Sequence, residues 1–316
     1  MSDRQFKFDK IAEKDFGEVT LLAKENGGNE NMSEAFLRHW YLDNPSGAYA
    51  IWKVNEADRI EGFATTNNFS FKIHNQVVKV AMPQNVLTSG RVRGMGLFNK
   101  LYNHTHQQNI NENGVTAFLT FTNDMSTPIF LGKFGYVKAK CPDVFFLLPR
   151  LTAGSPGVRY KVLPSVNEIP KQFINEKLAP DNALMKDAQY YTWRYGQYSS
   201  NELFVLEVKN RQEVIGYIIL KRVQRKKVPF LVLMDMIFVE KANYPILMNT
   251  SRKFAASKFH AGVLAYNLAD LPYNPGSFSK QFQHRFNFLV KGLSDEETTS
   301  LAETDFNLWF GDMDIF

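Results

Sequence analysis

The hydrophobic pattern changes twice along residues 80–122. Residues 115–122 are mostly apolar and rich in β-branched and aromatic side chains, which predicts a buried strand. Ahead of it, apolar residues recur at spacings of three and four, so we expect a helix that begins near residue 97. One face of this helix consists of Leu97, Phe98, Leu101 and Tyr102. The run that ends at Thr88 is strand-like, so residues 89–96 join a strand to a helix.

Shorter strand-like runs precede this segment. Residues 69–73 and 76–80 flank His74 and Asn75, a pattern typical of two antiparallel strands joined by a tight turn. Antiparallel strands followed by strand, helix, strand and helix predict an α/β fold of the α+β kind, in which helices cover the faces of a mixed sheet.

The same pattern occurs twice along the chain. Three separated segments match in the same order at offsets of 153, 154 and 152 residues. The matched pairs are Trp40 and Trp193, Gly62 and Gly216, and Gly135 and Asn287. We therefore expect two copies of one domain, residues 1–150 and residues 151–316, that meet at the turn-rich stretch 151–157.

Composition limits the class of protein. The 316 residues are 44% hydrophobic, enough for two cores of ordinary size, and the single cysteine, Cys141, excludes an internal disulfide. The longest apolar run, 230–239, contains Asp235 and is far shorter than the roughly 20 residues of a membrane span. No signal-peptide pattern opens the chain. We expect a soluble protein of the reducing cytoplasm.

Charge adds little to this picture. The formal net charge is +5 and the pI is about 9.0, which favours an acidic ligand without identifying one. The densest basic run, residues 221–227, contains no interleaved aromatic side chain that could stack on bases. We interpret it as a solvated hairpin tip and expect no nucleic-acid partner.

The segment 89–96 has the chemistry of an anion site. The first amides of a helix have no partner within the helix and carry partial positive charge, and glycines let the backbone approach a ligand closely. Gly94 and Gly96 supply the glycines, and Arg91 and Arg93 add full charges. A pyrophosphate would fit. The segment is neither a P-loop nor a dinucleotide fingerprint, because the Lys-Ser/Thr pair and the third glycine with a later acidic residue are missing.

Together with the next segment, this pattern resembles a known family. The order of elements is a strand, an Arg-Gly-x-Gly turn, a helix and a second strand, followed by Asn123-x-x-Ser126 and a Lys-x-Gly-aromatic run at 133–136. This order resembles the coenzyme A-binding core of the GNAT (N-acetyltransferase) superfamily. With the C-terminal run 309–314, the whole chain resembles tandem GNAT proteins from bacterial surface-polysaccharide gene clusters. The resemblance implies two tandem GNAT-like domains and acetyl-CoA as co-substrate.

The resemblance also implies where the coenzyme binds. The family's loop can start at Arg91 or at Arg93; the second register aligns the helix leucines better, although Phe98 then replaces a small residue. In either case the amides of residues 93–98 would hold the pyrophosphate and the strand backbone would hold the pantetheine arm. The implied coenzyme-binding residues are Val86, Leu87, Thr88, Arg91, Arg93, Gly94, Met95, Gly96, Leu97, Phe98, Asn123, Ser126 and Phe130.

The second copy lacks these features. Projected by 153 residues, the phosphate loop falls on residues 244–249, which contain no glycine. Bulky side chains there would keep a ligand away from the backbone. We expect residues 151–316 to be a degenerate GNAT-like domain that keeps the fold and has lost the coenzyme site.

The catalytic groups are not identified by the sequence. Many GNAT enzymes carry a tyrosine where this chain has Leu131, and no carboxylate stands on the strand 76–86. The weak candidates are Asn123, Asn85, Asp235 and Tyr41, and Tyr102 and Tyr136 remain beside them. Each has a structural alternative: Asn123 suits a turn, and a buried Asp235 would need a partner. We expect Ser126 to cap the following helix. His104 and His106 are two residues apart and cannot share a helix face, so we expect no metal.

These observations lead to one main hypothesis and two alternatives. The main hypothesis is an acetyl-CoA-dependent N-acetyltransferase whose acceptor is an amine of a small molecule, with an amino sugar as the family-level expectation. One alternative is a non-catalytic acyl-CoA-binding sensor or scaffold, which the missing tyrosine supports. The other is a Fem-type aminoacyl transferase. The sequence leaves open whether the protein is a monomer or a homodimer.

Overall fold

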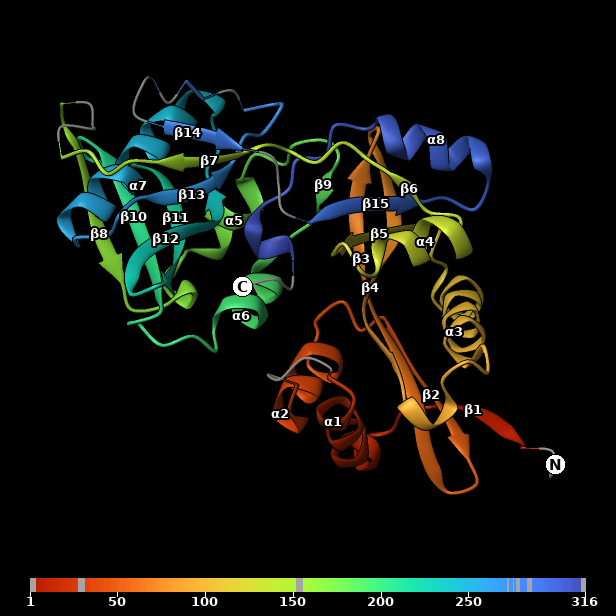
Figure 1. The fold of residues 1–316 in the computed structure, drawn as a ribbon. Coiled ribbons are helices and arrows are strands. Elements are labelled where there is room, and N and C mark those ends of the chain that lie inside the picture. Colours follow the sequence, from red (N-terminus) through yellow and green to blue (C-terminus); the bar gives the residue numbers. More distant parts are fainter. Residues whose placement is uncertain are drawn as a thin grey trace. The chain divides into compact units, whose positions relative to one another are not determined.

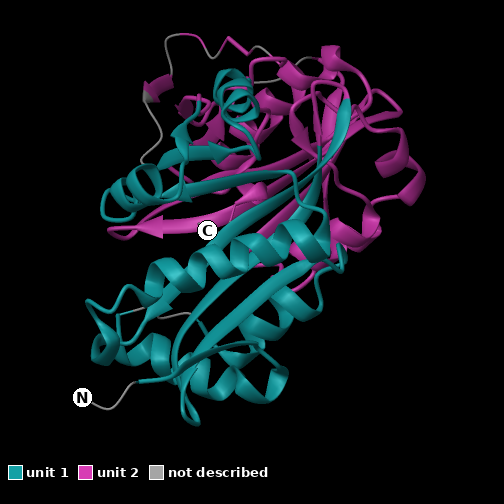
Figure 2. Ribbon diagram, turned by 90° about the vertical axis from the view of Figure 1, so that its right-hand side faces the viewer, with its two compact units in different colours: residues 1–71, 76–139, 286–304 teal, residues 72–75, 140–285, 305–316 magenta. Residues whose placement is uncertain are grey.

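The computed structural model describes residues 4–27, 32–151, 156–271, 273–274, 276, 279–282 and 286–313. The chain forms two compact units (Figure 2). Unit 1 comprises residues 1–71, 76–139 and 286–304, and unit 2 comprises residues 72–75, 140–285 and 305–316. Most of the expected linker, residues 152–155, lies outside the described residues, as does Asp314 of the C-terminal run. The boundary at residue 150 stays a prediction.

Unit 1 is built around a mixed sheet with the strand order β1-β2-β3-β4-β5-β15-β6 (Figure 1). The strands are β1 (Phe6–Lys10), β2 (Tyr49–Glu56), β3 (Arg59–Ile73), β4 (Gln76–Thr88), β5 (Ala117–Thr122), β15 (Asn287–Lys291) and β6 (Val137–Lys138). The helices are α1 (Phe16–Glu25), α2 (Glu34–Leu37), α3 (Leu97–Asn113), α4 (Thr127–Lys133) and α8 (Asp295–Glu303). A π-helical turn (Arg38–Leu42) follows α2, and short 3-10 turns cover Glu13–Asp15 and Gly90–Val92.

Unit 2 has a second mixed sheet with the order β8-β10-β11-β12-β13-β7-β14. The strands are β7 (Val144–Leu147), β8 (Val158–Leu163), β10 (Leu203–Asn210), β11 (Glu213–Arg225), β12 (Val228–Ile237), β13 (Val263–Tyr266) and β14 (Ser279–Phe282). Unit 2 also contains a short strand, β9 (Ala183–Leu184), that is not part of this sheet. The helices are α5 (Lys171–Glu176), α6 (Ala188–Tyr195) and α7 (Tyr244–Ser257). Short 3-10 turns cover Val166–Glu168, Lys241–Asn243 and Phe310–Asp312.

The predicted elements around the glycine turn are confirmed. The buried strand is β5, the helix is α3, and the two runs around His74 and Asn75 are the ends of β3 and β4 joined at a turn. Leu97 and Leu101 of α3 are buried with Trp52, and Tyr102 is buried with Phe118. Truncating such a buried leucine to alanine costs about 2–5 kcal/mol, so this packing fixes where the N-terminus of α3 lies.

The two sheets repeat one arrangement. In each, a parallel ladder joins two strands: β4 pairs with β5 at Val80↔Ala117 and Ala81↔Phe118, and β12 pairs with β13 at Leu231↔Val263 and Val232↔Leu264. The β2–β3 ladder of unit 1 carries a bulge at Val54/Asn55, and the β10–β11 ladder of unit 2 carries one at Val208/Lys209. The α/β fold with two similar halves is therefore confirmed.

The repeated glycines have a common steric reason. A Cβ on Gly62 would lie 2.9 Å from the carbonyl oxygen of Leu87, and a Cβ on Gly216 would lie 2.9 Å from that of Ile237. Carbon does not approach a backbone oxygen so closely without a shift of the strand. The two glycines allow β3 and β11 to pass close to the ends of β4 and β12.

One feature of the topology was not predicted. In unit 1, the strand beside β5 is β15, which comes from the end of the sequence, and in unit 2 the strand beside β13 is β7, which comes from its first half. Each sheet is thus completed by a strand from the other half of the chain. Among the described helices, none is long and apolar enough to cross a bilayer.

Candidate functional site

Strand β4 leaves its parallel neighbour before it reaches the glycine turn. Its ladder with β5 covers Val80 and Ala81, whereas β4 continues to Thr88. The other edge of β5 is paired with β15 along Phe118–Thr122. Residues 82–88 therefore extend past the parallel ladder as half-buried or buried backbone, and the predicted pantetheine-binding residues Val86, Leu87 and Thr88 lie on this stretch.

The turn after β4 is anchored at its start. Ser89 donates its amide to the carbonyl oxygen of Glu61 (2.7 Å), and its hydroxyl accepts a hydrogen bond from the amide of Arg91 (3.1 Å). The amide of Gly90 donates to Oδ1 of Asn26 (2.8 Å). Gly94 and Gly96 then adopt left-handed φ values of 84° and 70°, which glycine reaches without steric penalty. Gly96 is the residue immediately before α3.

Free amides gather where α3 begins. The amides of Val92, Arg93 and Met95 donate to carbonyl oxygens within the turn. A Cβ placed on Gly94 or Gly96 would meet no atom within 4 Å, so the turn is open rather than sealed by side chains. Unpaired amides at a helix N-terminus attract anions. The amides of Gly94, Gly96, Leu97 and Phe98 have no acceptor among the described residues.

The two arginines at the turn differ in their partners. The Nε atom of Arg91 lies 3.2 and 3.3 Å from the two carboxylate oxygens of Glu61, which is fully buried and also pairs with Arg59 at 2.7 Å. Burial alone would raise the pKa of the Glu61 carboxyl, but these guanidinium groups hold it below its ordinary value. Arg93 is exposed and forms no ion pair with any described residue. Its charge is therefore the one left for a ligand.

Asn123 and Ser126 lie at the turn that leads into α4. Oδ1 of Asn123 accepts hydrogen bonds from the amides of Met125 (3.1 Å) and Ser126 (2.9 Å) and from the Ser126 hydroxyl (3.0 Å). The prediction that Ser126 caps α4 is wrong, because its hydroxyl accepts no helix amide and is instead held by Asn123. Phe130 is buried on α4 among Tyr102, Phe134 and Tyr136. Coenzyme binding by Asn123, Ser126 and Phe130 stays a prediction.

Two of the catalytic candidates meet beside β4. The Tyr41 hydroxyl donates to Thr65 Oγ1 (2.7 Å) or Gln84 Oε1 (3.1 Å) and accepts from Nδ2 of Asn85 (3.4 Å). Thr65 also bonds to the backbone amide and carbonyl of Asn85, both at 3.1 Å, and Trp40 donates its indole N–H to Gln84. Tyr41 is fully buried, whereas Asn85 and Gln84 are half-buried. The structure thus places the Tyr41 hydroxyl against the side-chain amide of Asn85, the residue before Val86.

Sequence reasoning missed the polar strand behind this cluster. Residues 65–68 of β3 read Thr-Thr-Asn-Asn, and all four are buried. Thr65 faces Tyr41, while Thr66 and Asn68 bond to Asn109 of α3 (2.8 and 2.7 Å). Four consecutive polar residues inside an apolar strand were the signal that could have revealed it, because buried polar groups need partners.

The tyrosines Tyr102 and Tyr136 form a second pair. Their hydroxyl oxygens are 2.7 Å apart in the buried aromatic cluster, against which Val86 also packs. Burial raises the pKa of both phenols above its ordinary value, so both keep their protons at neutral pH. Leu131, where the family's tyrosine was expected, packs against the same cluster.

The two histidines of α3 pack on rings. His104 stacks on Phe8 and meets the edge of Trp52, and His106 stacks on Phe118 with centroids 3.6 Å apart. Burial and the charge of Lys291 lower the pKa of His106 to about 3. Both rings therefore remain neutral at pH 7 and serve packing.

In unit 2, Asp235 has the partner that its burial requires. Its Oδ2 atom accepts from the ammonium of Lys186 (2.7 Å) and from the Tyr195 hydroxyl (3.3 Å), and its Oδ1 accepts from the amide of Met236 (3.0 Å). The Lys186 ammonium also lies 2.5 Å from Oδ1 of Asp312. Burial lowers the pKa of Lys186, but the two carboxylates outweigh it and hold the pKa above its ordinary value.

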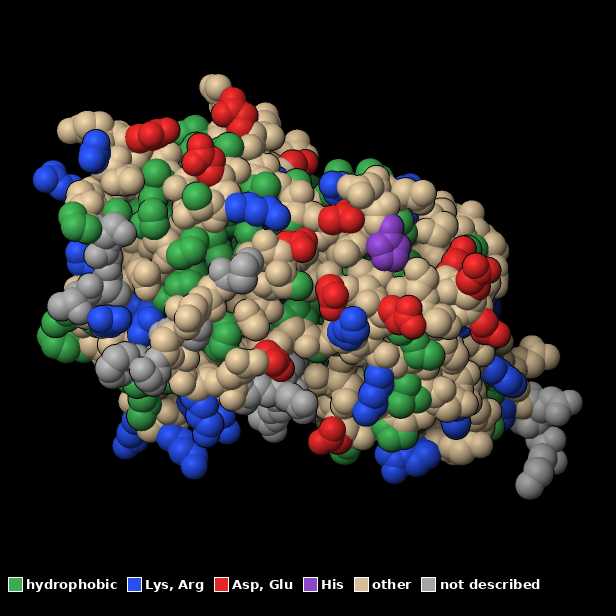
Figure 3. All heavy atoms as spheres, turned by 90° about the horizontal axis from the view of Figure 1, so that it is seen from above, with side chains coloured by type: hydrophobic (Ala, Val, Ile, Leu, Met, Phe, Trp, Pro, Cys, Tyr) green, Lys and Arg blue, Asp and Glu red, His purple; other side chains and the backbone are tan. Residues whose placement is uncertain are grey.

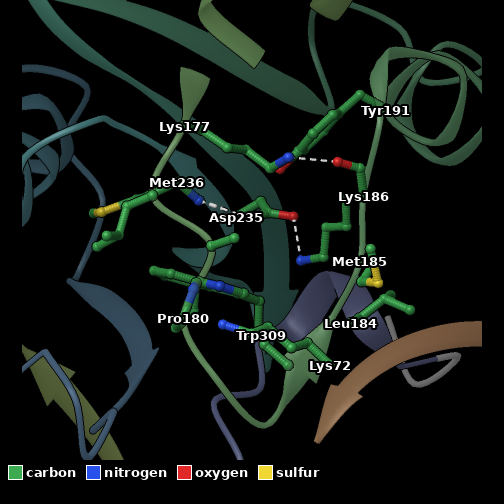
Figure 4. A pocket seen from close by; sticks show the side chains of 13 residues that line it. Lys72, Lys177, Pro180, Leu184, Met185, Lys186, Tyr191, Asp235, Met236 and Trp309 are labelled. Atoms are coloured by element: carbon green, nitrogen blue, oxygen red, sulfur yellow. Dashed lines mark hydrogen bonds and ion pairs between the residues drawn. The ribbon is translucent and has the colours of Figure 1, made fainter. Parts of the chain in front are cut away.

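This charged group borders a small cavity (Figure 4). The cavity measures about 140 Å³, and Lys72, Lys177, Trp309 and Met236 are among its lining residues. The ammonium of Lys177 donates to the carbonyl oxygen of Lys186, as Figure 4 shows, and burial lowers the pKa of Lys177. The lysines satisfy carboxylates and carbonyls of unit 2 itself.

The two candidate clusters occupy equivalent positions in the repeat. Asn85 lies two residues before Leu87, whose carbonyl oxygen lies next to Gly62. Asp235 lies two residues before Ile237, whose carbonyl oxygen lies next to Gly216. Each is hydrogen-bonded to a tyrosine hydroxyl, Tyr41 at 3.4 Å or Tyr195 at 3.3 Å. Unit 1 keeps a neutral amide at this position, whereas unit 2 has an ion pair in its place.

The phosphate-loop segment of unit 2 differs as its sequence suggested. Residues 244–249 form the first turns of α7, with Tyr244, Leu247 and Met248 fully buried. No glycine turn precedes this helix in the described chain; a 3-10 turn at Lys241–Asn243 leads into it. The loss of the coenzyme site from unit 2 stays a prediction.

Comparisons with known proteins identify the fold. No family model matches the sequence, and no curated protein sequence matches it. Among solved structures, a GCN5-related N-acetyltransferase from Anabaena variabilis is similar with a TM-score of 0.69 at 14% identity, over 92% of this chain and 73% of that one. One from Kribbella flavida has a TM-score of 0.66 at 13% identity, over 95% and 74%.

A third similar structure is Saccharomyces cerevisiae N-myristoyltransferase with bound myristoyl-CoA, with a TM-score of 0.51 at 10% identity, over 92% of this chain and 84% of that one. At these identities the similarity concerns the fold. The chain has the fold of the GCN5-related N-acetyltransferases over nearly its full length.

Proposed function

We propose that the chain is an acyl-CoA-dependent N-acyltransferase whose unit 1 binds the acyl-CoA. The observation that carries this proposal is the open turn at which the amides of Gly94, Gly96, Leu97 and Phe98 have no acceptor among the described residues. It lies at the end of a strand that has left its parallel neighbour, in a fold shared with acetyl- and myristoyltransferases.

The free amides suit a diphosphate. Hydrogen bonds to charged groups contribute roughly 1.5–3 kcal/mol each, and the helix dipole and Arg93 add to them. Residues 82–88 of β4 offer backbone groups to the amide-containing pantetheine arm, because a strand edge pairs with any extended chain that carries amides. We propose acetyl-CoA as the donor, since the sequence resemblance points to it.

The acyl-transfer step sets the remaining requirements. The lone pair of a neutral amine attacks the thioester carbonyl, the carbon–sulfur bond breaks, the nitrogen loses one proton and the coenzyme thiolate gains one. Asn85 lies on β4 one residue before Val86, and its side-chain amide is hydrogen-bonded to the Tyr41 hydroxyl; we assign these two groups to acceptor positioning and proton transfer. Asn123 lies at the end of the neighbouring strand β5.

We further propose a small-molecule amine as acceptor, with an amino sugar as the first candidate from the family resemblance. We keep the expectation of a tandem protein whose second domain has no coenzyme site and which acts in the cytoplasm. The missing family tyrosine, replaced by Leu131, supports a non-catalytic acyl-CoA sensor as the second candidate function.

Thermal unfolding with acetyl-CoA, followed by a thiol-release assay, tests the proposal. Acetyl-CoA at 100 times its Kd stabilises the folded state by about 2.7 kcal/mol, or roughly 5–10 °C for a unit of this size. Release of free coenzyme A with any member of a panel of amino sugars and small amines supports an enzyme. Stabilisation without release across the panel indicates the sensor. If acetyl-CoA causes no shift at 1 mM, the proposal is refuted.

A further inference from the structure

Unit 2 carries an apolar surface patch of unusual exposure. Phe259 exposes 92% of its surface, Leu151 69% and Val228 51%. Together with Pro149, Pro229 and Ala261 they line a shallow hollow of about 600 Å³, and we call this surface the Phe259 patch. Large apolar side chains so exposed and so close together indicate a binding surface.

The backbone around the patch is held in unfavourable conformations. Phe259 follows α7 with a φ of 56°, in the left-handed region that bulky side chains avoid. Lys226 and Lys227 form the tip of the β11–β12 hairpin with φ values of 48° and 66°, where Asn and Gly are the preferred residues. Among the described residues, the side chains of Phe259, Lys226 and Lys227 form no hydrogen bond, ion pair or ring contact that would offset this strain. Such outliers are typical of functional positions.

Basic side chains surround the patch. Lys226 and Lys227 precede Val228 directly, and Lys258 precedes Phe259. Arg222 and Arg225 lie on the same hairpin, and none of these five side chains forms an ion pair with a described residue. The charges of Arg222 and Lys258 reach His260 beneath the patch, where burial is the main cause that lowers its pKa. Figure 3 shows Lys and Arg side chains beside exposed hydrophobic ones on the side of unit 2.

We infer that the Phe259 patch docks on an anionic lipid bilayer. Aliphatic and aromatic side chains that protrude between unpaired lysines and arginines match the apolar interior and the negative surface of such a membrane. A nucleic acid would instead require aromatic rings spaced between the charges, and residues 221–227 contain none. The inference concerns unit 2 alone and holds whether or not unit 1 binds acyl-CoA.

Sedimentation of the 316-residue protein with vesicles tests the inference. We expect binding to vesicles of 70% phosphatidylcholine and 30% phosphatidylserine, weak binding to pure phosphatidylcholine, and release when NaCl is raised from 0.1 to 0.5 M. Each lysine near an anionic surface contributes roughly fivefold in partition coefficient, so Lys226→Glu with Lys227→Glu lowers it more than about 25-fold. Phe259→Ser lowers it by about tenfold or more, because one aromatic ring no longer enters the bilayer.

Matched controls separate docking from general charge and folding. Lys161→Glu with Lys171→Glu makes the same change in net charge on exposed lysines that do not border the hollow, and Leu21→Ser removes an exposed leucine of unit 1. Both controls should bind vesicles as the unaltered chain does, and all variants should keep its melting temperature. Equal binding to both vesicle types, no binding at all, or a dimer that Phe259→Ser dissociates without vesicle binding would overturn the inference.

Discussion

Replacement of Lys186 by Met tests the buried charge cluster of unit 2. Its ammonium lies 2.7 Å from Asp235 and 2.5 Å from Asp312, and all three side chains are at most 4% exposed. The variant leaves two buried carboxylates without a counterion, and breaking a buried ion pair from one side costs about 3–5 kcal/mol. We expect a loss of that size in the free energy of unfolding at pH 7.5.

The loss should depend on pH with a definite sign. Burial raises the pKa of Asp312 from 3.8 to about 6 while Lys186 is present. The protonated Asp312 therefore stabilises the unaltered protein at low pH, and this contribution to the free energy of unfolding is lost as the pH rises to about 6 and does not change above it. Without the ammonium the pKa rises higher, and the variant goes on losing about 1.4 kcal/mol per pH unit. Between pH 6 and 7.5 the gap between variant and unaltered protein should therefore widen by about 2 kcal/mol.

Urea unfolding followed by fluorescence at pH 6 and 7.5 measures this gap. A second variant, Lys186→Met with Asp235→Asn and Asp312→Asn, removes both carboxylates that Lys186 neutralises, so its gap should stay constant across the two pH values. The reasoning is refuted if Lys186→Met costs less than about 1 kcal/mol or if its gap does not widen between pH 6 and 7.5. It is also refuted if the gap of the triple variant widens by the same amount.

Three further predictions concern unit 1. His106→Phe should reduce acid sensitivity: the pKa of His106 is about 3 in the fold and 6.5 outside it, so the unaltered protein loses about 2 kcal/mol between pH 7.5 and 5 by urea unfolding, and the variant should not. Tyr41→Phe and Asn85→Ala should each lower kcat roughly tenfold or more with the Kd of acetyl-CoA unchanged; unchanged kcat in both would exclude them from the chemistry. Gly62→Ala should lower the free energy of unfolding by about 1–3 kcal/mol and weaken acetyl-CoA binding, because its Cβ would press on Leu87 and Thr88. In the same assays Gly132→Ala, whose Cβ meets no atom within 4 Å, should have neither effect.

Much of the fold follows from local patterns in the sequence. The apolar spacing of Leu97 and Leu101 marks α3, and the recurrence of Trp40 and Gly62 at Trp193 and Gly216 marks the two copies. The sequence pattern could not predict that β15 pairs with β5 and β7 with β13. The strands of the two copies have the same alternation of apolar and polar residues, and packing decides which strands pair.

At the candidate site too, features set by single residues could be predicted, whereas contacts between residues far apart in the sequence could not. An open glycine turn at Gly94 and Gly96 follows from residue type, since few other residues adopt left-handed φ there. The pairing of Arg91 with buried Glu61, and of Asp235 with Lys186, joins residues 30 and 49 positions apart. Such pairs are set by the tertiary fold, so the sequence indicated that Asp235 needs a partner without naming it.

Calorimetric titration of acetyl-CoA into the protein and two variants of Gly96 tests the central claim most directly. Gly96→Ala and Gly96→Trp share the strain of a side chain at a φ of 70°, but the larger ring fills the open space in front of the free amides. The account predicts one acetyl-CoA per chain, retained by Gly96→Ala and lost in Gly96→Trp. No binding by the unaltered protein, or equal binding by Gly96→Trp, would contradict it.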